Sequence, residues 1–272
     1  MDAKRILFIT QEITPYLPES ELSIIGRNLP QGIQERGREI RTFMPKFGNI
    51  NERRNQLHEV IRLSGMNLII DDTDHPLIIK VASIQSARMQ VYFIDNEDFF
   101  QRKGSLRNER GKEYEDNDER SIFYIRGVLE TIKKLRWIPD LIHCHGWFSA
   151  LTSLYLKRMY ADDPCFKDTK IVYSIYADDF NEPLRGAIVE KLIMDGAKEA
   201  DMKELRTDTS FTSLTMLAIN FSDGVIQGSE TIRPEITDYI SSLADKPFLP
   251  YQPQDTYINS INNFYDSILN SK

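Results

Sequence analysis

The stretch Lys4–Leu29, a strand, a loop and the start of a helix, constrains the fold more than any other part of this chain. Arg5–Thr10 is a short apolar run rich in Ile and Phe, which is typical of a buried strand in a parallel sheet. Pro15 and Pro18 exclude regular structure from the loop, and Ser20 is a good N-cap for the helix that follows. One apolar face of that helix is expected to pack on the sheet, through Leu22, Ile25, Leu29 and Ile33.

Strands and helices alternate along much of the remaining chain. Asn117–Leu135 is predicted to be a long helix, Asp140–Cys144 a strand, and Glu230–Leu243 a helix. Between residues 57 and 95, β-rich runs follow one another without helices, which predicts hairpins: Glu59–Leu63, Met66–Ile70, Leu77–Ser83 and Met89–Ile94. We therefore expect one Rossmann-like α/β domain over residues 1–272, with a mostly parallel sheet flanked by helices and a β-hairpin excursion.

Charge and cysteine content narrow the classes of partner and compartment. The formal net charge is −7, from 34 Lys and Arg against 41 Asp and Glu, which argues against nucleic acid or an anionic membrane as the main partner. Two cysteines, Cys144 and Cys165, are too few for a disulfide framework, so we expect reduced thiols. No signal peptide or membrane-length apolar stretch is recognisable, and we expect a cytoplasmic protein.

The stretch around the first loop resembles the bacterial and plant glycogen and starch synthases. The shared residues are Glu12, Pro15, Tyr16, Leu22, Leu29, Pro30 and the run FMPKFGNIN from Phe43 to Asn51. The resemblance implies a GT-B N-terminal-type domain whose family reaction transfers glucose from ADP-glucose to the non-reducing end of an α-1,4-glucan. It also implies that the C-terminal nucleotide-sugar domain is absent, and that residues 245–272 form a linker and a capping helix. The residues themselves predict a last strong element at Tyr257–Leu269, with an apolar stripe at Ile258, Ile261, Phe264, Tyr265 and Ile268.

The phosphate-binding loop of that family is not kept. By register, Pro18 stands for the family lysine, Glu19 for the threonine, and Ser20 and Glu21 for the two glycines. At ~5 Å and an effective dielectric constant of ~20, one carboxylate against one phosphate charge costs about 3 kcal/mol before screening. Alternatively, Glu19 and Glu21 simply favour the dipole in the first turn of a helix. Either interpretation predicts a loop that no longer holds phosphate.

Other donor-site positions also depart from the family. The run from His143 to Phe148 matches His-x-His-Asp-Trp-His, with Gly146 in place of the aspartate and Phe148 in place of the last histidine. Tyr176-Ala177 replaces a His-Asn pair, and Met216 replaces a lysine. His143 and His145 share one strand face without a third ligand, so we expect no metal, no cofactor, and structural histidines that are hydrogen-bonded near the strand end.

By resemblance, four retained residues would line a vestigial sugar pocket: Glu12, Asp116, Asn117 and His145. An alternative for Asp116 and Asn117 is a helix N-cap with Arg120 paired locally. The lost positions Pro18, Phe148, Tyr176 and Met216 suggest that the fold is kept without the catalysis of the family, as in a pseudoenzyme.

The function expected from the resemblance is that of a glycogen or starch synthase-like protein of α-1,4-glucan metabolism, unable alone to transfer glucose. Two alternatives are left open. One is a carbohydrate-binding module, which needs only a groove with aromatic residues available to stack on sugar rings, namely Tyr16, Trp147, Phe148 and Tyr176. The other is a regulatory or assembly partner of a complete synthase chain, or a homo-oligomer, that uses the face which the second domain would cover. No nucleic acid or membrane partner is expected.

Overall fold

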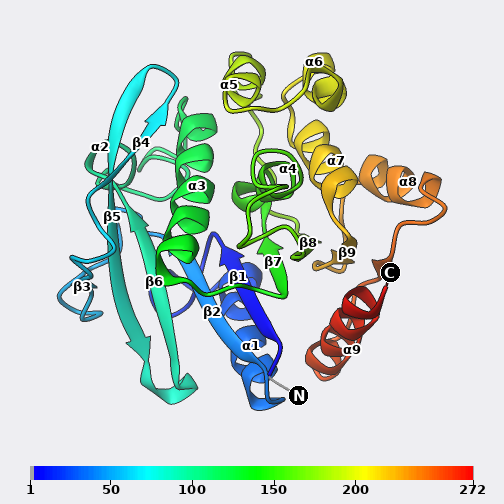
Figure 1. Ribbon diagram of the computed structural model, residues 1–272, viewed down its shortest axis with the longest axis horizontal. Coiled ribbons are helices and arrows are strands. Elements are labelled where there is room, and N and C mark those ends of the chain that lie inside the picture. Colours follow the sequence, from blue (N-terminus) through cyan, green and yellow to red (C-terminus); the bar gives the residue numbers. More distant parts are fainter. Residues whose placement is uncertain (1–2, 272) are drawn as a thin grey trace.

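A single sheet runs through the computed structural model, which describes residues 3–271 (Figure 1). The strand order is β10-β9-β8-β7-β1-β2-β6-β5-β3, with β4 paired to β5. The strands are β1 (Arg5–Thr10), β2 (Glu39–Pro45), β3 (His58–Glu59), β4 (Met66–Ile70), β5 (Thr73–Ile84), β6 (Met89–Asp95), β7 (Leu141–His145), β8 (Lys170–Ile175), β9 (Gly224–Gln227) and β10 (Phe248–Leu249). All pairs from β10 to β6 are parallel, which confirms the predicted Rossmann-like α/β class.

Helices cover both faces of the sheet (Figure 1). Their bounds are α1 (Glu21–Glu35), α2 (Glu97–Phe100), α3 (Asn117–Leu135), α4 (Thr152–Lys157), α5 (Ile188–Met194), α6 (Lys203–Thr207), α7 (Phe211–Phe221), α8 (Pro234–Ser242) and α9 (Tyr257–Asn270). On one face α1 and α9 share a core with alternate residues of β1, whereas α3, α4 and α7 belong to the core on the other face. Across residues 3–271, none of the helices combines the length and apolar character needed to cross a bilayer.

The predicted hairpin excursion is present as β3 to β6, but two of its boundaries differ. Only His58–Glu59 pairs as a strand, and the rest of the predicted run Glu59–Leu63 is a turn. The strand predicted to start at Leu77 already starts at Thr73, because Ile70 pairs with Thr73 across a two-residue turn. Asp71 has φ +53° in that turn, a left-handed conformation that Asp tolerates better than most residues.

The N-terminus of α1 follows the local signals in the sequence. The Ser23 N–H donates to Ser20 Oγ at 3.0 Å, and the Ser20 N–H donates to Ser23 Oγ at 2.8 Å, so the predicted N-cap is confirmed as a capping box. Gly26 then brings the helix close to the end of β1, since a Cβ there would lie 2.3 Å from the Glu12 carbonyl oxygen. By contrast, the helix predicted over 230–243 begins only at Pro234, which suits the first helical position.

The predicted closing helix is confirmed as α9, and its apolar stripe packs on the sheet face beside α1. Tyr265 and Ile268 are buried there together with Phe8 of β1 and Val172 of β8. Gly224 at the start of β9 makes room for it, because a Cβ there would meet Ile268 at 2.7 Å. That α9 caps a surface which a second domain would otherwise cover stays a prediction.

We expect Ile268→Ala to lower the free energy of unfolding by about 2–5 kcal/mol, the range for isoleucine truncation in a packed core. The side chain is 1% exposed and lies between α9 and the sheet. Asn263→Ala, at an exposed position of the same helix, is the control and should change stability little. Urea unfolding followed by circular dichroism measures both variants, and equal stabilities would contradict the packing of α9.

Candidate functional site

A polar cavity of about 390 Å³ lies at the carboxyl ends of β1, β7 and β8, where open α/β sheets bind ligands. Each of these strands contributes the residues that directly follow it. The lining includes Gln11 and Glu12 after β1, Trp147 after β7, residues 177–181 after β8, and residues 105–107 of the loop between α2 and α3.

Two hydrogen bonds from backbone N–H groups hold the turn after β7 against side chains that line this cavity. The Trp147 N–H donates to Asp178 Oδ2 at 2.9 Å, and the Phe148 N–H donates to Gln11 Oε1 at 3.2 Å. Gly146 begins the turn with φ +80°, and a Cβ there would lie 2.7 Å from both acceptor oxygens. The turn therefore requires glycine, and the aspartate found at this position in the resembled family does not fit.

Asp178 is a polar residue of the cavity that the sequence interpretation missed. Its Oδ1 is buried and has no hydrogen-bond partner within residues 3–271. Burial raises the pKa of Asp178 to about 7, and the nearby carboxylates of Asp179 and Glu12 act in the same direction. The signal available in the sequence was its position, because Ala177-Asp178-Asp179 directly follows a predicted buried strand.

Of the four predicted pocket residues, Glu12 is the one that lines this cavity. It is half-buried, and its Oε2 accepts a hydrogen bond from Ser20 Oγ at 2.6 Å. Ser20 is also the N-cap of α1, so this contact fixes the Glu12 carboxylate against the helix N-terminus. The position of Glu12 beside Asp178 makes the cavity acidic.

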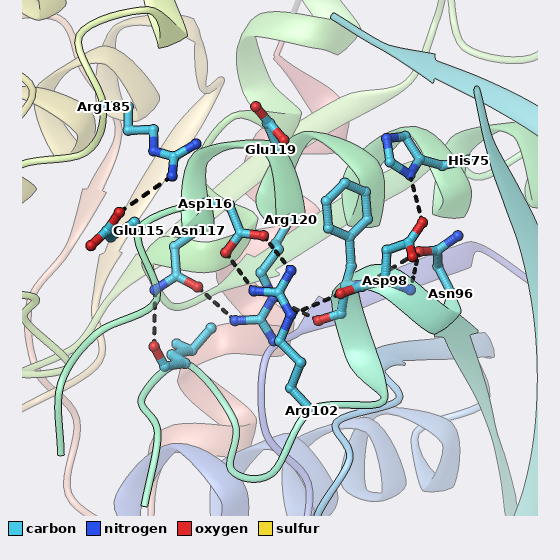
Figure 2. Close-up of polar contacts among 12 residues, drawn as sticks. His75, Asn96, Asp98, Arg102, Glu115, Asp116, Asn117, Glu119, Arg120 and Arg185 are labelled. Atoms are coloured by element: carbon cyan, nitrogen blue, oxygen red, sulfur yellow. Dashed lines mark hydrogen bonds and ion pairs between the residues drawn. The ribbon is translucent and has the colours of Figure 1, made fainter. Parts of the chain in front are cut away.

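Asp116 and Asn117 lie at the start of α3 and hold the preceding loop (Figure 2). Arg102 donates to both carboxylate oxygens of Asp116, at 2.7 and 2.5 Å. Asn117 Nδ2 donates to the Leu106 carbonyl at 2.9 Å, which positions a residue that does line the cavity. Asp116 is the N-cap residue but makes no capping bond with its side chain. A role of either residue at a sugar stays a prediction.

Arg120 is buried and anchors the same loop through the polar contacts drawn in Figure 2. Its guanidinium donates to the carbonyls of Phe99 at 2.8 Å and Ser105 at 2.9 Å, and to Asn117 Oδ1 at 2.6 Å. Burial lowers the pKa of Arg120 to about 10. The predicted local pairing of Arg120 is thus confirmed, and a buried cation holds the charged loop between α2 and α3.

His143 and His145 are buried and hydrogen-bonded, as predicted for structural histidines. His143 contacts the Tyr265 hydroxyl at 2.5 Å and Ser174 Oγ at 2.6 Å, and His145 Nδ1 contacts the Tyr176 hydroxyl at 2.8 Å. His145 is 1% exposed, so in this structure no ligand from solvent reaches its ring. Burial lowers the pKa of His145 to about 3, which keeps the imidazole neutral.

The aromatic residues expected to stack on sugars are not on the surface. Tyr16, Trp147, Phe148 and Tyr176 are all buried, and Phe148 stacks on Tyr124 in the core with ring centroids 5.7 Å apart. That expectation is wrong, and Phe148 and Tyr176 do not form an exposed apolar patch for a partner either. Large aromatic side chains beside a strand end gain more from core packing than from exposure.

The loop before α1 also differs in detail from the expectation. Pro18 and Glu19 are exposed and precede the N-cap, so Glu21 is the acidic residue of the first helical turn. The Glu21 carboxylate accepts a hydrogen bond from Ser229 Oγ at 2.5 Å, which links the helix N-terminus to the loop after β9. Met216, the fourth changed family position, is half-buried on α7. Within residues 3–271 no His, Cys, Asp and Glu residues cluster as a metal site.

Gly146→Ala should destabilise the protein by about 1–3 kcal/mol, because a non-glycine residue at this φ is strained and its Cβ meets Asp178 and Gln11. Gly146→Asp, which restores the family residue, should cost more. Gly186→Ala is the control, since nothing lies within 4 Å of a Cβ there and its φ is not positive. Thermal unfolding compares the three variants, and a Gly146→Ala protein as stable as wild type would contradict the geometry of the turn.

The low pKa of His145 predicts a pH-dependent contribution to stability. The unfolded chain takes up a proton near pH 6.5 and the folded chain only near pH 3, so the stabilisation is complete above pH 6.5 and falls as the pH drops through this window. The slope contributed by His145 is about 1.4 kcal/mol per pH unit. His145→Asn should remove that slope. We expect the difference in unfolding free energy between wild type and variant to shrink from pH 6 to pH 4, and a constant difference would contradict it.

Comparisons with known proteins show the family and support the fold. The starch synthase catalytic domain family matches residues 5–244. The glycogen synthase of Chlorobaculum tepidum is 32% identical over 267 residues, 98% of this chain and 52% of that protein, and the glycogen synthase of Chlorobium limicola is 38% identical over 173 residues, 63% of this chain and 35% of that protein.

Among solved structures, the catalytic domain of starch synthase IV from Arabidopsis thaliana, bound to ADP and acarbose, superposes with a TM-score of 0.72 at 17% identity. That match covers 94% of this chain and 53% of the plant chain, and it supports the fold. The chain thus spans about half the length, or less, of the relatives it matches. Since the family match includes residues 5–244, most of the chain, this protein belongs to the starch synthase catalytic domain family.

Proposed function

We propose that this chain serves α-1,4-glucan metabolism as a synthase-family domain that does not, by itself, transfer glucose from ADP-glucose. The family membership and the glycogen synthase relatives support the first part. The plant neighbour was solved with ADP and acarbose, which makes nucleotide and glucan the ligands to test here.

The absence of glucose transfer is supported mainly by the burial of His145. Tyr176 hydrogen-bonds its Nδ1, and the ring is removed from solvent. Phe148, where the resembled family has another histidine, is fully buried and has no group that can donate or accept a proton. General acid–base and electrostatic help at a glycosyl donor both require polar groups in contact with it. At this end of the sheet, β7 provides no such polar group.

Charge in the cavity also opposes a diphosphate. Glu12 and Asp178 line it, and the guanidinium of Arg107 is already paired with the Glu113 carboxylate at 2.9 Å. The first turn of α1, whose N-terminus would attract an anion, already carries the carboxylate of Glu21. A leaving diphosphate needs cations that this half of the crevice does not supply.

We expect no transfer of radiolabelled glucose from ADP-glucose to glycogen by the purified chain. The glycogen synthase of Chlorobaculum tepidum, assayed in parallel, serves as the positive control. Incorporation clearly above a no-protein blank would contradict the proposal. Calorimetry with ADP tests the charge argument separately from the argument based on His145. A micromolar dissociation constant would refute the charge argument alone, since such binding is about 4 kcal/mol stronger than binding with a millimolar constant.

A further inference from the structure

A second cavity, of about 500 Å³, lies at the amino ends of β2 and β6, which is the opposite end of the strands from the acidic cavity around Asp178. Its lining comes from the end of α1, the start of β2 and the start of β6, together with residues directly before the two strands. These segments place three arginines in the lining, Arg38, Arg41 and Arg88, against one carboxylate, that of Glu39. In a chain of formal net charge −7, the cavity is a local excess of positive charge.

The guanidinium of Arg41 is held in place while part of it has no partner. Its Nη1 donates to the Tyr92 hydroxyl at 2.6 Å, and its central carbon lies 5.6 Å from the ring centroid of Tyr92 and 5.3 Å from that of Trp137. These contacts orient the group before any ligand binds. Its Nε is buried and has no hydrogen-bond partner within residues 3–271. A buried donor in this state is unfavourable unless a ligand or a water molecule accepts from it.

The carboxylates beside the cavity are already engaged by other groups. Glu39 accepts from the Trp137 indole N–H at 2.5 Å and from Arg5 Nε at 3.1 Å. Asp266 of α9 is paired with Nη2 of Arg38 at 2.8 Å. Because these negative charges are neutralised by their own partners, they oppose an incoming anion less than free carboxylates would.

Four polar groups of the cavity are therefore available to a ligand. Within residues 3–271 neither Arg41 nor Arg88 forms an ion pair, so two guanidinium charges are not neutralised. The Tyr92 hydroxyl accepts from Arg41, which leaves its own proton to donate. Gln34 Oε1 is buried without a partner and needs a donor, such as a ligand hydroxyl.

From these groups we propose that the cavity binds a small phosphate monoester. Two guanidinium charges match a phosphate dianion better than a single carboxylate charge, and arginine is suited to bidentate contacts with phosphate oxygens. The acceptor atom of Gln34 and a volume of about 500 Å³ favour a ligand with a hydroxyl-bearing group attached to the phosphate. The volume lies within the range of roughly 300–1,000 Å³ that is typical of small-molecule sites.

The test is a titration of the full chain with glycerol 3-phosphate at low ionic strength and about pH 7.5, where the phosphate is a dianion. The chain has two tryptophans, and their indole N–H signals are resolved by proton–nitrogen NMR after isotope labelling. Trp137 lies beside Arg41, whereas Trp147 lines the acidic cavity, so the two signals report on the two cavities separately. We expect a saturable shift of the Trp137 signal with a dissociation constant on the order of 1 mM.

Three variants with the same change of charge locate the site. Arg41→Gln should weaken binding by about tenfold, because it removes a charge-assisted hydrogen bond from an oriented donor. Arg88→Gln, at an exposed position, should weaken it by about threefold. Arg54→Gln is the matched control, since Arg54 is exposed and outside the lining, and it should bind as wild type does. If Arg41→Gln fails to fold, Arg88→Gln decides.

Absence of a Trp137 shift at about 20 mM, twentyfold the expected constant, would overturn the proposal. So would a shift confined to Trp147, or equal dissociation constants for wild type and Arg88→Gln. Glycerate, which carries hydroxyls and a single negative charge, should bind at least fivefold more weakly, and equal binding would contradict the choice of phosphate. Tighter binding of inorganic phosphate than of glycerol 3-phosphate would contradict the choice of a monoester. The outcomes are independent of the glucose-transfer assay, because the two cavities share no lining residue.

Discussion

The buried contacts of two histidines on β7 are the constraint on which the rest of this structure depends. The rings of His143 and His145 lie 3.8 Å apart between centroids, deep between the sheet and α9. Because buried imidazoles at this distance must both stay neutral, each needs a neutral hydroxyl partner. Tyr265 supplies one from α9 and Tyr176 the other from the end of β8. The same contacts thus dock the last helix and close the strand end to solvent.

Because the end of β7 is closed to solvent, its histidines cannot contact a ligand in the crevice. Gly146 allows the turn to give its backbone N–H groups to Asp178 and Gln11, so these polar side chains satisfy the protein's own backbone. The cavity that remains is acidic, and Arg120 fixes the loop between α2 and α3 that lines it, through a hydrogen bond to the Ser105 carbonyl. Asp178 Oδ2 and Gln11 Oε1 are thus committed to the protein's own backbone, whereas Asp178 Oδ1 has no hydrogen-bond partner within residues 3–271.

Local signals predicted well those elements whose determinants are close in sequence. The Ser20 cap, the α1 stripe, the long helix α3 and the closing helix all depend on spacing within a few residues. Errors fell where a turn or a proline decides a boundary, as at Asp71 and Pro234. The aromatic residues were misjudged for another reason: a sequence shows that Phe148 is apolar, but not whether its environment is solvent or Tyr124.

The sequence by itself determined the α/β class, the resemblance to the synthases and the structural nature of the histidines, and it predicts a loop that no longer holds phosphate. Periodicity, capping and register carry that information because they act over short separations. The tertiary structure alone decided that Tyr176 covers His145 and that Glu21 bonds Ser229, 208 residues away. It also raised the pKa of Asp178, because burial is a property of the whole packed chain and no local pattern encodes it.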